Sequence, residues 1–143
     1  MASMATKALR LYFHSPCFDG IASAVLCWDF FEQRGDADVV HLHPVGYEQR
    51  EQWLSKSLPS RSAVVDFLFH PDAMFWVDHH ATTFLTPRAR ETFESSGSAN
   101  WAYDDRASSC AILLRRHLRK TFRYRNPRYD SLIEWANRIT RTN

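Results

Sequence analysis

Hydrophobic and polar residues alternate at the start of the chain as a β-strand requires. Apolar residues occupy every second position from Leu9 to Phe13, and the pattern ends at His14. After the next turn residues the spacing changes, because apolar residues recur every three or four positions from Gly20 to about Gly35. The sequence therefore predicts a strand, a tight loop and an amphipathic helix. The apolar face of that helix would consist of Ile21, Ala24, Val25, Trp28 and either Phe30 or Phe31.

Strand and helix signals keep alternating through the rest of the chain. We expect further strands over 38–45, 63–69 (ending around Asp66), 73–77 and 99–103, and helices over 48–57, 88–93, 110–118 and 129–140. Asp104 or Ser108 would cap the third of these helices. The last helix would bury Leu132, Ile133, Trp135, Ala136 and Ile139. This order favours an α/β fold with a mainly parallel β-sheet flanked by helices on both faces.

The length and charge of the chain indicate how many domains it forms and which classes of protein it resembles. With 143 residues and 45% hydrophobic content, residues 1–143 are expected to form a single domain. The 18 basic and 16 acidic residues give a net charge of +2, too balanced for a protein that coats nucleic acid by charge alone. The segment from Arg115 to Arg128 is basic and lacks acidic residues. It forms either a solvated helix face or a rim that attracts phosphate.

The cysteines and the amino-terminal residues indicate the cellular compartment in which the protein is expected. Cys17, Cys27 and Cys110 include no CxxC spacing, so neither a disulfide framework nor a zinc knuckle is indicated, and a reducing compartment fits best. Residues 1–9 contain no apolar run typical of a signal peptide, and no stretch approaches the roughly 18 apolar residues of a membrane span. We expect a cytoplasmic protein that does not contact a membrane.

Acidic and histidine residues gather where the expected strands end. His14 and Asp19 follow the first strand, Asp66 follows an apolar Ala-Val-Val run, and Asp78-His79-His80 follows Phe-Trp-Val. The carboxyl ends of parallel strands meet at one edge of a sheet, where ligands bind. A carboxylate at the end of an apolar strand needs a metal ion, an ion-pair partner or a helix to cap.

The residue types at these strand ends suit divalent metal ions. Hard divalent ions such as Mn²⁺ accept mixed carboxylate and imidazole ligands, and we expect two Mn²⁺ ions, with Mg²⁺ as the alternative ion. A catalytic zinc site is the competing interpretation.

Three segments occur in order at the ends of predicted strands: His14-Ser15-Pro16-Cys17-Phe18-Asp19-Gly20, Val65-Asp66 and Val77-Asp78-His79-His80. They resemble motifs one to three of the DHH phosphoesterase superfamily, and residues 103–114 resemble the helix start that follows the third motif. The superfamily includes exonucleases specific for single strands, oligoribonucleases, cyclic dinucleotide phosphodiesterases, polyphosphatases and family II inorganic pyrophosphatases. The resemblance implies an amino-terminal DHH domain that hydrolyses phosphate esters with manganese.

The resemblance also implies metal ligands. His14 and Asp19 match ligands of the first motif, and His79 matches a ligand of the third. Asp66 matches the carboxylate that bridges two ions. Cys17 stands where the family has its first carboxylate, and as a thiolate it would be a softer ligand.

Roles in catalysis follow from the same resemblance. Asp78 would orient its neighbours, and His80 would face the substrate phosphate. A water bridging the two ions would attack phosphorus in line. We add Arg115 and Arg116 as candidate substrate-binding residues because of their charge. The expected substrate is a nucleotide or a short oligonucleotide.

Two further features depart from the family. Thr140 stands where the fourth motif has an aspartate, and the carboxy-terminal substrate-binding domain of the family has no counterpart in this sequence. Either the sequence is a truncated product that lacks this domain, or a partner chain, such as a second copy, completes the substrate site. Two alternatives stay open: a DHH-like domain that binds metal, nucleotide or a partner protein without turnover, and an unrelated parallel α/β binding module.

Overall fold

A five-stranded parallel sheet forms the centre of the protein. The computed structural model describes residues 6–142. Every pair of neighbouring strands is parallel, in the order β2-β1-β3-β4-β5. The strands are β1 (Ala8–His14), β2 (Val39–Val45), β3 (Ser62–Val65), β4 (Phe75–Asp78) and β5 (Trp101–Tyr103). The predicted α/β fold with a mainly parallel sheet is confirmed.

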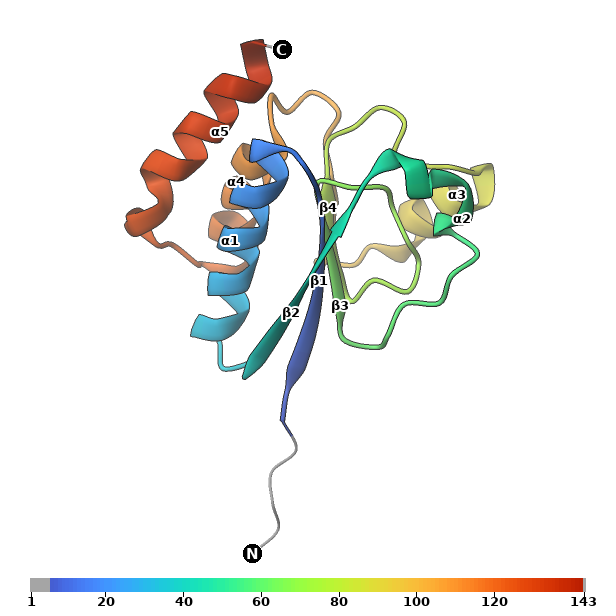
Figure 1. Ribbon diagram of the computed structural model, residues 1–143, viewed down its shortest axis with the longest axis horizontal. Helices are drawn as coiled ribbons and strands as arrows, with labels where there is room; N and C mark the ends of the chain where they lie inside the picture. Colours follow the sequence, from blue (N-terminus) through green and yellow to red (C-terminus); the bar gives the residue numbers. More distant parts are fainter. Residues whose placement is uncertain (1–5, 143) are drawn as a thin grey trace, which may run out of the picture.

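Helices cover both faces of this sheet (Figure 1). One face carries α1 (Phe18–Gln33) and α4 (Cys110–Phe122), with α5 (Asp130–Thr142) outside them, and the other carries the shorter α2 (Arg50–Trp53) and α3 (Pro87–Ser96). Single-turn 3₁₀ helices, Tyr47–Gln49 and Pro127–Tyr129, precede α2 and α5. Within residues 6–142, no helix has both the length and the apolar character needed to cross a membrane. The sequence predicts no signal peptide within residues 1–9. Part of this segment lies outside the described residues.

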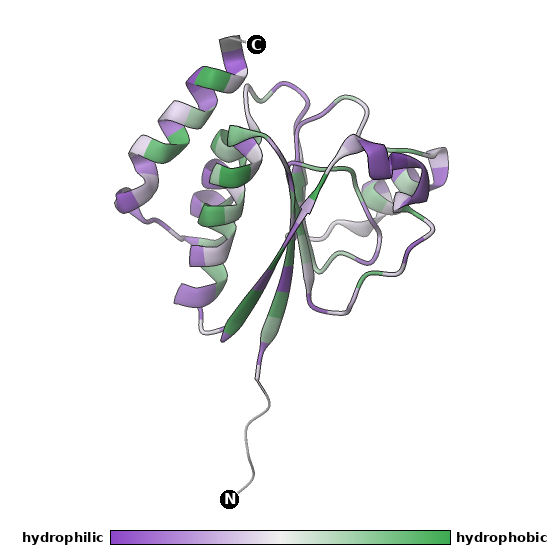
Figure 2. Cartoon of the chain, viewed as in Figure 1, coloured by the Kyte–Doolittle hydropathy of each residue, from purple (hydrophilic) through white to green (hydrophobic). Residues whose placement is uncertain are grey.

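Two hydrophobic cores lie on the two faces of the sheet because successive strand residues point in opposite directions. Leu11, Val65 and Val77 belong to the core under α1 and α4, whereas Val64 and Trp76 belong to the core on the other face. All five are fully buried. Strands of a parallel sheet covered on both faces are hydrophobic nearly throughout, and Figure 2 shows hydrophobic residues concentrated in the strands, α1 and α4.

The strand predicted over 63–69, ending around Asp66, ends at Val65 in the structure. Asp66 has a φ of 58°, in the left-handed region that residues other than glycine rarely adopt, so the strand ends there. The carbonyls of Phe67 and Leu68 accept the indole N–H groups of Trp76 (2.9 Å) and Trp53 (3.0 Å). These two side chains satisfy buried backbone groups that have left the sheet, and they hold the chain in place just after Asp66.

Helix boundaries also differ from the prediction. Instead of one helix over 48–57 there is a 3₁₀ turn followed by the four-residue α2, and α3 is longer than the predicted 88–93. Ser109 caps α4, since its hydroxyl accepts the N–H of Ile112 at 3.2 Å. The predicted caps, Asp104 and Ser108, both lie in the loop before α4. Asp104, Ser108 and Ser109 are all residue types that cap helices, so the sequence alone does not show which of them is the cap. The backbone geometry of the turn decides.

Two helices bury only part of the predicted face, since Ala24, Phe30, Ile133 and Ala136 are buried as predicted and four other predicted residues are exposed. Ile21 and Trp28 of α1 are 45% and 37% exposed, and Trp135 and Ile139 of α5 are 55% and 39% exposed. The buried residues of these helices include Ala22, Leu26, Phe30, Ile133 and Ala136. Because α5 packs mainly on α1 and α4 and not on the sheet, it buries only a narrow stripe.

The strand register brings the carboxyl ends of the strands together. Phe13 of β1 lies beside Val65 of β3, and Val65 lies beside Val77 of β4. The residues that follow these three positions therefore emerge next to one another at the same edge of the sheet.

Candidate metal centre

The carboxyl edge of the sheet gathers most of the side chains predicted to bind metal. His14 ends β1, Cys17 is the N-cap residue of α1, Asp66 follows β3, and His79 and His80 follow β4. Their ligand atoms form two groups within 4.8 Å, one of Asp66, Asp78, His79 and His80 and one of His14, Cys17 and Asp66. Asp66 belongs to both groups and is the centre of the site.

Asp66 presents one carboxylate oxygen to each side of the cluster. Its Oδ2 lies 3.7 Å from Cys17 Sγ and 3.9 Å from His14 Nδ1. Its Oδ1 lies 3.5 Å from His79 Nε2 and 3.9 Å from His80 Nδ1. The side chain is only 1% exposed. Burial raises the pKa of Asp66 to about 7, with His79 opposing the rise.

Three buried polar atoms of the cluster have no hydrogen-bond partner among residues 6–142: His14 Nδ1, Asp66 Oδ1 and Asp78 Oδ2. An unsatisfied buried group costs about 1–3 kcal/mol, and more when it is charged. Burial, together with the nearby His80, lowers the pKa of His14 and so favours its neutral ring. A cation among these side chains would satisfy buried carboxylate and imidazole atoms of this kind.

His79 is held in one orientation. Its Nδ1 lies 3.0 Å from the carbonyl oxygen of Ala107, so Nδ1 is the donor and Nε2 faces Asp19 (3.4 Å) and Asp66 (3.5 Å). A bare Nε2 would be repelled by the two carboxylates, so a proton or a metal ion is needed between them. Burial favours the neutral ring, but these carboxylates outweigh it and raise the pKa of His79 to about 10.

His80 forms a close pair with Asp78. Its Nδ1 lies 2.6 Å from Asp78 Oδ1, with the carboxylate fully buried and the ring 29% exposed. Burial alone would lower the pKa of His80, but the Asp78 carboxylate gives a net rise. Since Nδ1 is engaged by Asp78, the Nε2 atom of His80 is left for another partner.

Asp19 lies beside the cluster but makes a different set of contacts from the predicted one. Its two oxygens accept the backbone N–H groups of Cys110 (2.9 Å) and Ala111 (2.8 Å) at the start of α4. A carboxylate at a helix amino terminus is favoured by the helix dipole. Asp19 thus anchors α4 next to His79, and within the described residues it belongs to neither group of clustered ligand atoms.

Arg115 and Arg116, predicted to bind substrate, form ion pairs elsewhere. Arg115 donates to Asp130 (3.2 Å) and Glu134 (2.6 Å) of α5, and Arg116 donates to Asp104 (2.8 Å). In the described part of the chain, neither arginine has a hydrogen bond or ion pair with the metal-centre cluster. These contacts favour a helix-face role for Arg115 and Arg116 over a place in a phosphate-attracting rim.

The carboxyl-terminal helix reaches the start of α4 through a residue that the sequence did not single out. Asn137 Oδ1 accepts the hydroxyls of Ser108 (2.5 Å) and Ser109 (2.8 Å). Thr140, at the predicted fourth-motif position, forms no hydrogen bond with the cluster among residues 6–142.

Tyr47 and Gly20 also belong to the surroundings of the site. The Tyr47 ring lies 4.8 Å from the His14 ring and 5.9 Å from the His80 ring, between centroids, and is 37% exposed. It follows β2 at the carboxyl edge, so the rule that found the other residues applies to it as well. A Cβ on Gly20 would lie 2.0 Å from the carbonyl oxygen of His14, so only glycine lets α1 approach β1 this closely.

The residues present fit a divalent metal centre. The separations of 3.4–3.9 Å between their ligand atoms exceed ordinary hydrogen-bond lengths. Atoms that share an ion at about 2.1 Å lie roughly 3–3.5 Å apart. Carboxylate and imidazole donors suit Mn²⁺ and Zn²⁺ alike, so the donor set defines a metal centre without naming the ion.

Metal affinity is expected to fall with decreasing pH. A metal ion must displace the proton that His79 holds up to about pH 10, and below about pH 7 also the proton of Asp66. Mn²⁺ binding should therefore release about one more proton at pH 6 than at pH 8, which titration calorimetry in buffers of different ionisation enthalpy would count. Equal proton release at the two pH values would contradict the participation of Asp66.

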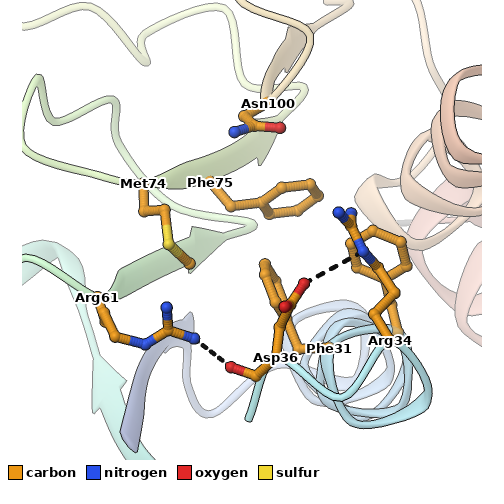
Figure 3. A pocket seen from close by; sticks show the side chains of 8 residues that line it. Phe31, Arg34, Asp36, Arg61, Met74, Phe75 and Asn100 are labelled. Carbon is orange, nitrogen blue, oxygen red and sulfur yellow. Dashed lines mark hydrogen bonds and ion pairs between the residues drawn. The ribbon is translucent and has the colours of Figure 1, made fainter. Parts of the chain in front are cut away.

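A pocket of about 190 Å³ lies at the opposite, amino-terminal edge of the sheet (Figure 3). Its lining includes Arg34 and Arg61, but both guanidinium groups are engaged: Arg34 with the Asp36 carboxylate at 3.2 Å, and Arg61 with the carbonyls of Ala8 and Asp36. This pocket is small for a ligand site and shares no residue with the metal-centre cluster.

The chain matches no protein-family model and no curated protein. Among solved structures it is similar to an exopolyphosphatase-related protein from Bacteroides fragilis, with 14% sequence identity and a TM-score of 0.45. The match covers 96% of this chain and 44% of that protein, so the chain spans less than half of its length. The fold and the site together define an α/β protein with a candidate metal centre at the carboxyl edge of its sheet.

Proposed function

We propose that the chain is a DHH-type, manganese-dependent phosphoesterase that hydrolyses phosphodiester bonds of nucleotides or short oligonucleotides. The observation that carries this proposal is the gathering of His14 on one side of Asp66 and Asp78 on the other, where each of the three side chains has a buried atom that lacks a hydrogen-bond partner among the described residues. The order of three motif-like segments at the ends of the adjacent strands β1, β3 and β4 supports the choice of phosphate ester as substrate. Without a cation, the same cluster would be a costly group of unpaired acceptors.

The metal-holding residues in this proposal are His14, Cys17, Asp66 and His79, with Asp19 alongside. Divalent ions at such a site neutralise phosphate charge and make water a better nucleophile near neutral pH. Asp66 separates the two sides of the site, since each of its oxygens faces a different group. The Ala107 carbonyl fixes the His79 ring so that Nε2 points inward.

His80 and Asp78 form the proton-transferring pair of the proposal. With Nδ1 held by Asp78 at 2.6 Å, the ring of His80 can deliver a proton from Nε2 to the leaving oxygen of the ester. Tyr47, half-exposed beside both His14 and His80, offers an aromatic surface on which a base can stack.

The proposal is tested by hydrolysis of bis(p-nitrophenyl) phosphate and of a dinucleotide with added Mn²⁺. The wild-type protein should release product, and chelation or His79→Ala should reduce the rate to background. Glu94→Gln, an exposed carboxylate on α3 paired with Arg90, is the matched control and should retain full activity. Wild-type rates no higher than those of His79→Ala would refute the proposal.

Replacing His80 should separate catalysis from metal binding. His80→Asn is expected to lower kcat by about 10²–10⁴-fold, the usual contribution of a positioned acid or base, with Mn²⁺ affinity changed less than about tenfold. Steady-state kinetics and calorimetry on one preparation give both values. A parallel loss of affinity would instead make His80 a metal ligand.

A non-catalytic metal-binding domain is the second candidate. Both oxygens of Asp19 are used by the backbone of α4, which leaves fewer free lone pairs for a metal ion. Stoichiometric Mn²⁺ binding without hydrolysis of either substrate would favour this candidate over the enzyme.

A further inference from the structure

We infer that the metal centre consists of two chemically unlike subsites, and that the subsite of His14, Cys17 and Asp66 takes a softer divalent ion, such as Zn²⁺ or Co²⁺, than its neighbour. The inference deepens the proposed function and rests on its metal centre. The neighbouring subsite, on the side of Asp66 that His79 approaches with the His80–Asp78 pair beside it, offers only nitrogen and oxygen donors.

The geometry of Asp66 divides the two subsites. Cys17 Sγ and His14 Nδ1 both approach Oδ2, at 3.7 and 3.9 Å. His79 Nε2 and His80 Nδ1 both approach Oδ1, at 3.5 and 3.9 Å. Because sulfur approaches one oxygen only, the ion at the Oδ2 side meets a mixed sulfur, nitrogen and oxygen environment, and the ion at the Oδ1 side does not.

A second observation points to a ligand at this place. Among the described residues, His14 Nδ1 of this subsite has no hydrogen-bond partner, and neither has Oδ1 of the 1% exposed Asp66, which faces the other subsite. On the Oδ2 side the nearest group is the thiol of Cys17, a weak donor at 3.7 Å. A thiol in that position leaves the carboxylate poorly satisfied, whereas a thiolate that shares a cation with it would not.

Cys17 is the N-cap residue of α1, so its sulfur lies at the positive end of the helix dipole. Burial and the neighbouring Asp66 carboxylate raise the pKa of the Cys17 thiol in the metal-free protein, so it is a bound cation that would stabilise the thiolate. The other two cysteines are fully buried: Cys27 lies in the hydrophobic core, and Cys110 Sγ lies 3.4 Å from the carbonyl of Val77. The thiol proton leaves to solvent when the ion binds.

Ion preference follows from donor chemistry. Thiolate ligands favour Zn²⁺ and Co²⁺ over Mn²⁺, whereas carboxylate and imidazole ligands accept Mn²⁺ readily. The centre should therefore hold one thiolate-bound ion and one ion with nitrogen and oxygen ligands, and should prefer Zn²⁺ and Co²⁺ over Mn²⁺ more strongly at the thiolate subsite than at the other.

The test uses Co²⁺ alone as a probe, added to the metal-free full chain under reducing conditions. Sulfur bound to Co²⁺ gives a charge-transfer absorption in the near ultraviolet, which nitrogen and oxygen ligands do not. The wild-type protein should show this band. Cys17→Asp and Cys17→Ser should lose it, and Cys27→Ala should keep it.

The same variants report ion preference. The Cys17 subsite is the one expected to bind Mn²⁺ more weakly. In Cys17→Asp, its preference for Zn²⁺ over Mn²⁺, given as the ratio of the two affinities in calorimetric titrations, should fall at least about tenfold, because a carboxylate replaces the soft donor. If one of the two variants, Cys17→Asp or Cys17→Ser, does not fold, the other still tests whether the absorption band depends on Cys17.

The outcomes separate this inference from the proposed function. No band in the wild-type protein, or a band that persists in Cys17→Ser, overturns the thiolate subsite, and Mn²⁺-dependent hydrolysis would still stand on its own assay. A band that depends on Cys17 in a protein that hydrolyses no phosphodiester supports the subsite and removes the enzymatic proposal.

Discussion

Replacing Asp66 by asparagine should remove metal binding and at the same time stabilise the metal-free protein. Asparagine keeps the size of the side chain and is one of the few residues that tolerate the positive φ of this position. It lacks the charge that both sides of the cluster need. Mn²⁺ affinity should fall by at least about 100-fold, because loss of an outer partner of a metal ligand already costs about 10–100-fold.

The gain in stability depends on pH in a defined direction. The pKa of Asp66 is raised from 3.8 to about 7 in the folded protein, so the folded state holds the proton more tightly than the unfolded state. Without metal, wild-type stability should therefore decline as the pH rises from about 4 to 7. The variant lacks this ionisation, and we expect it to be about 1–3 kcal/mol more stable at pH 8 and similar to the wild type near pH 4.

Urea denaturation with a chelator at the two pH values measures this difference. Glu94→Gln makes the same chemical change at an exposed ion pair and should alter stability by less than about 1 kcal/mol. If Asp66→Asn were instead less stable than the wild type at pH 8 without metal, the protein alone would satisfy the carboxylate, and the main argument for a cation at this site would be lost.

The positions of the strand ends could be predicted from the sequence because two simple rules act there. Alternating and continuous apolar runs identify buried strands, and parallel strands deliver their carboxyl ends to one edge. These rules place His14, Asp66 and His79 together before any coordinates are known, and the structure brings their side chains within a few ångströms. Tyr47 follows the same rule and was overlooked because an aromatic residue after a strand is not a recognised signal.

Other features depend on contacts that a linear pattern does not contain. The left-handed backbone of Asp66 is held by the loop after it, where Trp53 and Trp76 bond to backbone carbonyls. Asp19 contacts Cys110 and Ala111 of α4, which lie 91 and 92 positions further along the sequence. The exposure of Trp135 follows from packing of α5 on helices in place of the sheet. In each case tertiary structure decides between options that local sequence leaves equal.

Adding one methyl group at Gly20 is expected to destabilise the protein by about 3 kcal/mol and to disrupt the metal centre. The new Cβ would lie 2.0 Å from the carbonyl oxygen and 2.9 Å from the carbonyl carbon of His14. These are backbone atoms, so they cannot rotate away as a flexible side chain would, and overpacking of this kind costs about 1–3 kcal/mol or more. Alanine's better helix propensity, about 1 kcal/mol, offsets only part of the cost. Relief requires α1 to move away from β1, which carries Cys17 away from Asp66.

Gly35→Ala separates crowding from backbone effects in this prediction. Gly35 has a φ of 71° with no atom within 4 Å of an added Cβ, so alanine there should cost only the roughly 1–2 kcal/mol of a left-handed backbone and leave Mn²⁺ affinity unchanged. Gly20→Ala should lose both stability and affinity, as measured by urea denaturation and calorimetry. If the two variants lost stability equally and Gly20→Ala bound Mn²⁺ normally, the close approach of α1 to β1 would not be what positions the metal centre.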